Sequence, residues 1–294
     1  MDNRSLNAFL TLADTLHFGR AADASHMSPS ALTRTIKQLE ANVGATLFDR
    51  DNRSVSLTRE GALFRRYARE ATALWDSFRD SLLDESESLS GTLTLYGSVT
   101  ASYSFLFDLL AALHADHPGI EITLQTGDPE QAVARVQAGD ADVSLGARPT
   151  QLPRALAFKT IAMTPLVFIA AADDPRAATL TRKQATADDW RDVPLILPER
   201  GVARERTLSW FRRQRIAPAV ATQVAGNEAI VSMVSLGGGI GVVPQIVLDN
   251  SPLAERVTAL PVRTQPAPLE VGLFVLRKRL QNRLVRALWE TADY

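Results

Sequence analysis

The sequence predicts two kinds of fold in one chain: an all-α helix-turn-helix domain with a two-stranded wing, followed by an α/β domain of two lobes. Three observations support this prediction. Residues 1–44 contain three short amphipathic patterns with a turn between the second and the third. Residues 59–85 form one long pattern with heptad spacing. From residue 91 onward, short apolar runs alternate with helical patterns, which is typical of α/β domains.

Length and composition permit a sizeable core but do not indicate a partner. The chain has 294 residues, of which 46% are hydrophobic, so two or three domains are expected. The formal net charge is −1, and residues 1–58 contain six basic and six acidic side chains. Any attraction to nucleic acid therefore depends on where the charges point and not on their sum.

The chain has no cysteine, which excludes disulfides, thiol nucleophiles, thiol redox sensing and cysteine-ligated zinc. Its four histidines do not have metal-ligand spacing, so we expect no metal and no cofactor. The N-terminus enters an amphipathic pattern directly and lacks the apolar run of a signal peptide. No stretch of about 20 apolar residues is present. We therefore expect a cytoplasmic protein without a membrane partner.

Apolar spacing and capping residues mark the first three helices. The second helix starts near Gly19 and ends at a turn, residues 25–27. Ser28 is a good N-cap for the third helix, and Pro29 suits its first position because the missing N–H costs nothing there. This helix is expected to end near residue 42, where Gly44 can adopt the left-handed cap. The first helix has one apolar face, made by Leu6, Phe9, Leu10, Ala13 and Leu16.

The third helix has two different faces. Leu32, Ile36 and Leu39 follow the spacing i, i+4, i+7 of a stripe that is buried against other helices. Another side, about 200° round the helix, carries only hydroxyls and cations. A face of this kind fits a DNA major groove, because hydroxyl and guanidinium groups reach base edges and phosphates. Its residues are Ser30, Thr33, Arg34 and Lys37.

A wing is expected to follow the third helix. Leu47 and Phe48 should close the small core, and residues 49–57 should form two strands with a tip near residues 51–52. Arg50 and Arg53 lie where a wing meets phosphates. Together with the helix-turn-helix of residues 18–37, the wing predicts double-stranded operator DNA as a partner. The residues expected to contact it are Ser28, Pro29, Ser30, Thr33, Arg34, Lys37, Arg50 and Arg53.

Thr58 can cap a long helix that continues to about residue 85. Phe64, Ala71 and Phe78 are seven residues apart, and this heptad spacing is typical of helices that pair. An ordinary core helix is the alternative. Pairing gains support because a dimer doubles the DNA contacts of one small head over two half-sites. Residues 84–90 are polar and are expected to form a hinge. The alternate heptad positions hold Tyr67, Ala68, Leu74, Trp75 and Leu82.

The remaining chain alternates strands and helices. The order β-α-β-α-β predicts a parallel sheet with right-handed crossovers, and a second cycle predicts a second lobe with a cleft between the two. The first cycle has strands at residues 92–96, 120–126 and 141–146, and helices at residues 103–117 and 129–138. The second cycle and the C-terminus have strands at residues 166–170, 195–197, 219–224, 240–243 and 269–276, and helices at residues 203–215, 227–236 and 280–291.

Residues 1–58 resemble the winged helix-turn-helix of LysR-type transcriptional regulators. The whole chain shares the likeness, because these regulators continue with a linker helix and a two-lobed effector domain of the type 2 periplasmic-binding-protein fold. Ser28-Pro29-Ser30 stands where the family often has a Ser-Gln pair, so base contacts by a glutamine are not expected here. The matching residues are Phe18, Ala21, Ala22, Ser28, Leu32, Arg34, Ile36, Leu39, Glu40, Gly44, Leu47, Phe48, Arg50, Leu57, Thr58, Arg59, Glu60 and Gly61.

The resemblance implies a domain organisation and a set of partners. The DNA-binding domain would comprise residues 1–58, the dimerisation helix and hinge residues 59–90, and the effector-binding domain residues 91–294. Lobe I would hold about residues 91–162 and 266–294, and lobe II about residues 163–265. Members of the family regulate transcription as homodimers or homotetramers and contact RNA polymerase, so the same is expected of this chain.

Within the family, the chain looks most like an activator of branched-chain amino-acid (isoleucine and valine) biosynthesis. This likeness implies a small carboxylate effector, 2-acetolactate or 2-aceto-2-hydroxybutyrate, and a regulator that responds to a different small carboxylate is the alternative. The last two of the similar stretches lie in lobe II of the effector domain, and the effector domain is where family members differ most. The stretches are residues 17–34, 50–61, 97–106, 208–213 and 227–252.

A small carboxylate needs N–H donors and a few hydroxyl or amide groups. Residues 97–100 lie between a strand end and a helix start, where free N–H groups and the helix dipole favour an anion. Residues 201–202 precede a second-lobe helix and can offer N–H groups from the opposite wall. For every candidate, capping or loop chemistry alone is the alternative. The candidate effector-binding residues are Ser98, Val99, Thr100, Thr126, Gly146, Val202 and Asn227.

Two other classes of protein fit the sequence less well. An enzyme with a DNA-binding appendage would need catalytic residues, but the chain lacks cysteine, a G-x-S-x-G elbow and a metal-spaced cluster. The glycine run at residues 237–241 follows a helix and precedes a strand, the reverse of a phosphate loop, so capping and close packing are expected there. A plain solute-binding protein is opposed by the helix-turn-helix. We therefore expect no enzyme.

Overall fold

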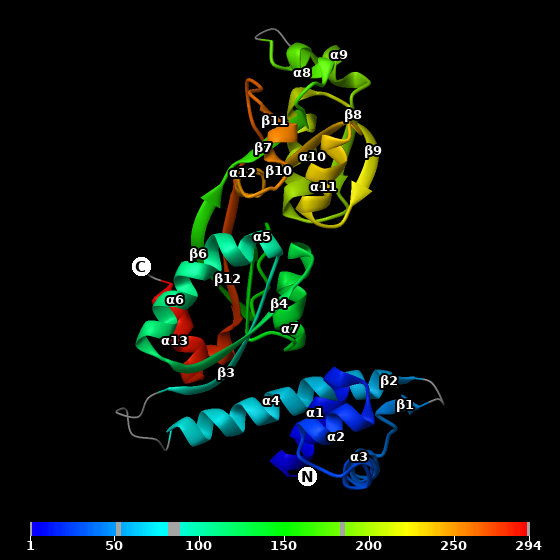
Figure 1. Cartoon of the computed structure of the whole chain (residues 1–294), viewed down its shortest axis with the longest axis vertical. Coiled ribbons are helices and arrows are strands. Elements are labelled where there is room, and N and C mark those ends of the chain that lie inside the picture. The colour runs from blue at the N-terminus through cyan, green and yellow to red at the C-terminus, as the bar shows by residue number, and fades with distance from the viewer. Residues whose placement is uncertain (1, 51–53, 82–88, 183–185, 293–294) are drawn as a thin grey trace. The chain divides into compact units, whose positions relative to one another are not determined.

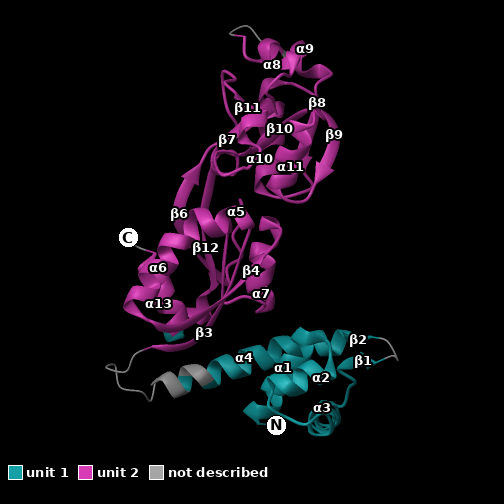
Figure 2. Cartoon of the chain, viewed as in Figure 1, with its two compact units in different colours: residues 1–87, 281–283 teal, residues 88–280, 284–294 magenta. Residues whose placement is uncertain are grey.

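The structure is a computed structural model that describes residues 2–50, 54–81, 89–182 and 186–292 (Figure 1). The chain divides into two compact units (Figure 2). The first comprises residues 1–87 with 281–283, and the second comprises residues 88–280 with 284–294. The predicted wing tip, Arg53, Leu82 and most of the predicted hinge lie outside the described residues.

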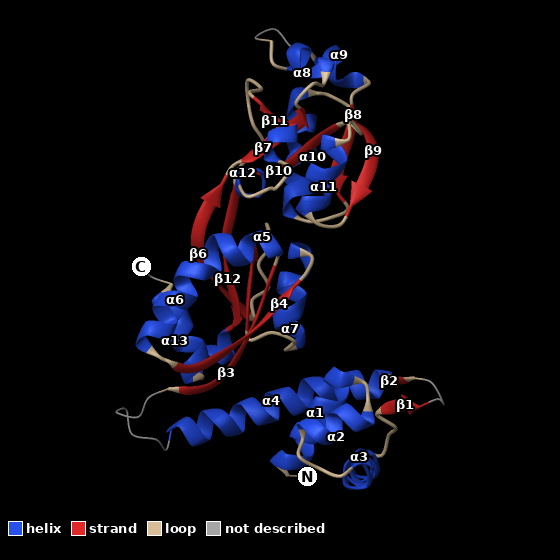
Figure 3. Cartoon of the chain, viewed as in Figure 1, coloured by secondary structure: helices blue, strands red, loops and turns tan. Residues whose placement is uncertain are grey.

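The first unit is a helical domain with a small wing, as predicted (Figure 3). Strand β1 pairs with β2 in antiparallel fashion and forms the wing. The elements are α1 (Asn3–Thr15), α2 (Phe18–Ala24), α3 (Pro29–Val43), β1 (Phe48–Arg50), β2 (Val55–Leu57) and α4 (Arg59–Ser81).

Local chemistry sets the ends of these helices. The Ser28 hydroxyl accepts a hydrogen bond from the N–H of Ala31 at 3.2 Å and caps α3. Gly44 closes α3 in the left-handed conformation with φ 75°. The N–H of Gly61 donates to Thr58 Oγ1 at 2.8 Å, so Thr58 caps α4. These three predictions are confirmed.

The core of the first unit gathers the predicted apolar stripe of α3. Leu32 and Ile36 are fully buried, and Leu47 and Phe48 close the core from the wing side as predicted. The Phe9 ring lies 5.2 Å from that of Phe48 and 4.7 Å from that of Phe64. This aromatic contact fixes α1 against both the wing and the long helix.

Lobe I of the second unit is built on a five-stranded sheet in the order β4-β3-β5-β12-β6. Strand β3 runs parallel to β4 and β5, whereas β12 runs antiparallel to β5 and β6. The strands are β3 (Ser90–Gly97), β4 (Gly119–Thr126), β5 (Val143–Ala147), β6 (Leu156–Thr164) and β12 (Leu269–Leu276). The helices are α5 (Val99–Ala101), a π-helical turn (Ser102–Leu106), α6 (Phe107–Asp116), a 3₁₀ turn (Pro129–Gln131), α7 (Ala132–Ala138), a second 3₁₀ turn (Arg277–Gln281) and α13 (Arg283–Thr291).

Lobe II has a second five-stranded sheet in the order β11-β7-β10-β8-β9. Strand β8 runs parallel to β9 and β10, and β7 runs antiparallel to β10 and β11. The strands are β7 (Leu166–Ala171), β8 (Pro194–Pro198), β9 (Ala219–Val224), β10 (Ile240–Pro244) and β11 (Val257–Leu260). The helices are α8 (Pro175–Leu180), α9 (Ala187–Arg191), α10 (Val202–Gln214), α11 (Asn227–Ser235), α12 (Gln245–Asp249) and a 3₁₀ turn (Ala254–Arg256).

The predicted parallel pairing of the first cycle is confirmed for β3, β4 and β5. Both sheets are nevertheless mixed, because each also holds antiparallel strands that the prediction did not include. The chain passes from lobe I to lobe II through β6 and β7 and returns through β11 and β12. Strands that leave a lobe and strands that enter it run in opposite directions, so β12 opposes β6 and β11 opposes β7. The sequence patterns did not predict β6 and β11. The helix expected to start at residue 103 begins at Val99 and passes through a π turn.

The glycine run after α11 serves packing, as expected. Gly239 has φ 142°, and a Cβ placed there would lie 2.2 Å from the carbonyl oxygen of Pro194. A Cβ on Gly241 would lie 2.6 Å from the Ile230 side chain. These close approaches explain why this turn holds glycines. No helix in the described part of the chain is long and apolar enough to cross a membrane.

Candidate DNA-reading face and effector cleft

Helix α3 presents its polar face to solvent. Ser30, Arg34 and Lys37 are exposed, as are Ser28 and Pro29 at the helix start, whereas the apolar stripe lies inside the domain. The opposite placement of the two faces is what a reading helix requires, because one side must hold the helix while the other meets the groove.

Two hydroxyls of this face already have backbone or neighbouring partners. The half-buried Thr33 donates from Oγ1 to the carbonyl oxygen of Pro29 at 2.8 Å. Its hydroxyl can still accept a hydrogen bond, and its methyl group can contact thymine. Ser28 Oγ caps α3 and lies 3.1 Å from Ser30 Oγ. The two exposed cations, Arg34 and Lys37, therefore offer the longest reach from this helix.

Arg50 is held within the domain. Its Nη2 lies 3.0 Å from Glu40 Oε2, and its guanidinium lies 4.9 Å from the centre of the Phe18 ring. Glu40 Oε1 also accepts hydrogen bonds from the N–H groups of Leu47 and Phe48, at 2.9 and 3.3 Å. The Arg50 side chain keeps 30% exposure, so a phosphate contact at this position would compete with an internal ion pair.

Helix α4 has two apolar faces. Phe64 and Ala68 are buried in the core of the first unit. Leu74 is 73% exposed, and its neighbours on that side are also open to solvent. The alternative of an ordinary core helix therefore accounts only for the first face. The exposed face consists of Leu63, Tyr67, Leu74, Trp75 and Phe78.

In the second unit, two of the three predicted effector residues at the start of α5, Ser98 and Thr100, are buried. Ser98 Oγ accepts from the N–H of Ala101 at 3.1 Å, which makes Ser98 the helix cap. Thr100 is 2% exposed and donates from Oγ1 to Glu228 Oε1 at 2.6 Å. This bond joins lobe I to lobe II next to Asn227. Val99 between them is 53% exposed.

The other predicted residues have different surroundings. Thr126 is exposed at the end of β4, and Asn227 lines a pocket between the lobes. Gly146 is buried, and a Cβ there would lie 2.9 Å from Ala132 Cβ, so close packing explains this glycine. Val202 is buried at the start of α10, where its N–H bonds the Glu130 carboxylate.

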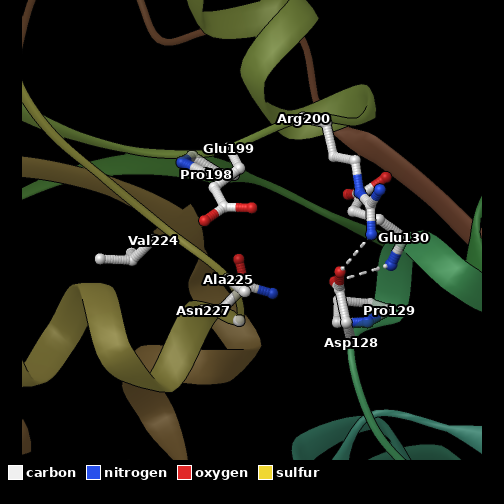
Figure 4. A pocket seen from close by; sticks show the side chains of 10 residues that line it. Asp128, Pro129, Glu130, Pro198, Glu199, Arg200, Val224, Ala225 and Asn227 are labelled. Atoms are coloured by element: carbon white, nitrogen blue, oxygen red, sulfur yellow. Dashed lines mark hydrogen bonds and ion pairs between the residues drawn. The ribbon is translucent and has the colours of Figure 1, made fainter.

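Charged residues line the cleft between the lobes, and the sequence analysis did not predict them as site residues. Arg200 Nη2 lies 3.3 Å from Asp128 Oδ2, and the backbone N–H of Glu130 donates to Asp128 Oδ1 at 3.1 Å (Figure 4). The pocket is open to solvent at its mouth. It is lined by Asp128, Pro129, Glu130, Pro198, Glu199, Arg200, Val224, Ala225, Gly226 and Asn227. No group of acidic, histidine or cysteine side chains in the described ranges is arranged to hold a metal ion.

Both parts of the chain match one family. Residues 3–62 match the bacterial regulatory helix-turn-helix proteins of the lysR family, and residues 86–293 match the LysR substrate binding domain. The HTH-type transcriptional activator IlvY of Salmonella typhimurium is 41% identical over 295 residues, covering 99% of each chain. The HTH-type transcriptional regulator IlvY of Escherichia coli is 40% identical, covering 99% of this chain and 98% of the relative.

Solved structures share the fold. A full-length OxyR variant from Pseudomonas aeruginosa has a TM-score of 0.75 at 22% identity and covers 100% of this chain and 95% of its own. Full-length CbnR in complex with its target DNA has a TM-score of 0.66 at 22% identity, with 100% and 99% covered.

A helix-turn-helix head joined to a two-lobed binding domain defines a transcriptional regulator with a domain for a small-molecule effector. The chain belongs to the LysR family of bacterial transcriptional regulators, and it is a regulator and not an enzyme.

Proposed function

We propose that this regulator activates genes of isoleucine and valine biosynthesis in response to 2-acetolactate or 2-aceto-2-hydroxybutyrate. The observation that carries the proposal is the identity of 40–41% with IlvY regulators over nearly the whole of both chains. The matched length includes the effector domain, so the likeness extends to the part of the protein that selects the ligand.

The chemistry of the cleft is compatible with such an effector. Each proposed ligand carries a carboxylate, a hydroxyl and a ketone, and so needs N–H donors together with groups that both donate and accept. The start of α10 supplies N–H groups at Gly201 and Val202. Asn227 supplies an amide on the same pocket wall, and the Thr100–Glu228 pair lies beside it. A ligand that binds one lobe arrangement better than another shifts the population of the two.

The DNA-bound form is proposed to be a homodimer or a homotetramer in which the exposed face of α4 pairs with a second copy. Apolar side chains at heptad spacing on a helix gain free energy when a partner helix covers them. Pairing would place two α3 helices on two half-sites of an operator. The proposed DNA contacts are those of Ser28, Pro29, Ser30, Thr33, Arg34, Lys37, Arg50 and Arg53, and the activating contact is with RNA polymerase.

Calorimetric titration of the full chain with 2-acetolactate tests the effector. Lactate, which lacks the ketone-bearing branch, is the matched control ligand. We expect saturable heat with 2-acetolactate and none with lactate, and a gel shift of the chain's own upstream DNA with or without effector. Absence of heat, together with binding of another small carboxylate, would favour the alternative regulator of the same family. Failure to shift upstream DNA would remove the proposed reading face.

A further inference from the structure

The Glu130 carboxylate of lobe I lies on the first residues of α10 in lobe II. A Cβ placed on Gly201 would lie 1.7 Å from Glu130 Cδ and 2.1 Å from Oε1, so the carboxylate occupies the space directly above this glycine. The N–H of Val202 hydrogen-bonds the same carboxylate. Gly201 has φ 93°, a conformation that suits glycine. We call the N–H groups of Gly201 and Val202 the α10 anion site.

The surroundings of Glu130 oppose its charge. Burial raises the pKa of Glu130 to about 7, and the nearby carboxylates of Asp128 and Glu205 act in the same direction. The Val202 N–H and the Arg200 guanidinium act against them. Arg200 is shared with Asp128, and Glu199 lines the same pocket. The carboxylate is therefore attracted by the helix N-terminus but held there only weakly.

We propose that Glu130 is a tethered occupant of the α10 anion site, and that a carboxylate effector must displace it to bind. This inference rests on the proposed function, which places the effector carboxylate in the cleft. A second carboxylate cannot share the N–H groups of this helix start, because the Glu130 side chain fills the space directly above Gly201 and its ionised fraction repels another anion.

Displacement would couple ligand binding to the arrangement of the lobes. Glu130 follows β4 in lobe I, whereas Gly201 follows β8 in lobe II, so the occupied site joins the two lobes. A free carboxylate that takes the site removes this link and replaces it with its own contacts. Ligand and side chain thus favour different arrangements, which is the condition for a ligand to shift a conformational equilibrium.

Formate is the probe that tests the site without assuming the effector. The full-length chain, Glu130→Ala and the control Glu199→Ala, which removes a carboxylate from the same pocket, are compared by thermal unfolding at pH 7 with sodium formate against sodium chloride. We expect formate to stabilise Glu130→Ala and to leave the wild type and Glu199→Ala unchanged. If the site is open in about a tenth of wild-type molecules, the apparent affinity for formate rises about tenfold in Glu130→Ala.

Glu130→Gln keeps the shape and an acceptor for the Val202 N–H but loses the charge, so it should still exclude formate. Circular dichroism and operator binding verify that each variant is folded. An equal response to formate in Glu130→Ala and Glu199→Ala would overturn the proposal.

Titration of the same variants with 2-acetolactate separates the displacement of Glu130 from the identity of the effector. A formate response without 2-acetolactate binding would support Glu130 as the occupant of the α10 anion site and refute 2-acetolactate as the effector. Equal 2-acetolactate binding by all variants would refute the displacement of Glu130 and support 2-acetolactate as the effector.

Discussion

Replacing Glu40 by alanine should destabilise the N-terminal unit by about 2–4 kcal/mol. The change removes the acceptor of two half-buried N–H groups, those of Leu47 and Phe48. A donor left without a partner costs about 1–3 kcal/mol, and partial access of water places each of these near the lower end. Loss of the partly exposed ion pair to Arg50 adds about 0–1 kcal/mol.

Two further variants rank the contributions. Glu40→Gln keeps an acceptor and loses the ion pair, so about 1 kcal/mol is expected. Arg50→Ala leaves both backbone bonds in place and removes the ion pair and the contact with the Phe18 ring, for about 1 kcal/mol or less.

Hydrogen exchange of the amides of Leu47 and Phe48 is the appropriate assay, because it reports local opening in a chain whose two units can unfold separately. Glu40→Ala should lose protection at both amides and Arg50→Ala should keep it. If Arg50→Ala lost as much protection as Glu40→Ala, the backbone bonds of Glu40 would not be what holds the wing to α3.

Three other outcomes are expected. Arg34→Ala should weaken operator binding by about 1–3 kcal/mol if Arg34 reads a base, and it should leave the melting temperature unchanged. A binding titration with scrambled DNA is the control, because an equal loss of affinity there would show a phosphate contact instead. Ser98→Ala should lower the free energy of unfolding by about 1 kcal/mol, because the helix cap is lost, and should weaken induction while operator binding persists. A full response to 2-acetolactate in a reporter assay would mean that the effector carboxylate binds elsewhere. The pKa of Glu130 is raised from 4.5 to about 7, so its contribution to folding stability is fully present below pH 4.5 and is lost as the pH rises through 7. Melting curves should therefore show the wild type losing stability relative to Glu130→Gln between pH 4.5 and 7, with no further loss above that interval.

The N-terminal unit was predictable in detail because its signals are local. The hydroxyl of Ser28, the ring of Pro29 and the backbone freedom of Gly44 act within one turn of the residues they cap. The apolar stripe of α3 repeats with the helical period, so its buried face follows from spacing alone. By contrast, the engagement of Arg50 with Glu40 depends on two elements ten residues apart and carries no pattern in the sequence.

The α/β unit was predictable in its alternation of elements and in the parallel direction of β3, β4 and β5, but not in its antiparallel strands. Strand β12 matched its expected bounds, yet its place between β5 and β6 depends on pairing with strands more than a hundred residues away. Strand β6 was missed, because Lys159 and Thr160 interrupt its apolar run and β12 supplies its only pairing partner among the described strands.

The order of residues by itself determined the helix-turn-helix, its two-faced third helix, the alternation of the α/β unit and the family, since each depends on neighbours within a few turns or on likeness along the chain. Tertiary structure alone decided that Thr100 meets Glu228 and that Glu130 lies on the start of α10. Thr100 and Glu228 are 128 residues apart, and Glu130 and Gly201 are 71 residues apart. Only the folding of the chain back through two lobes brings these groups to one cleft, where burial raises the pKa of Glu130.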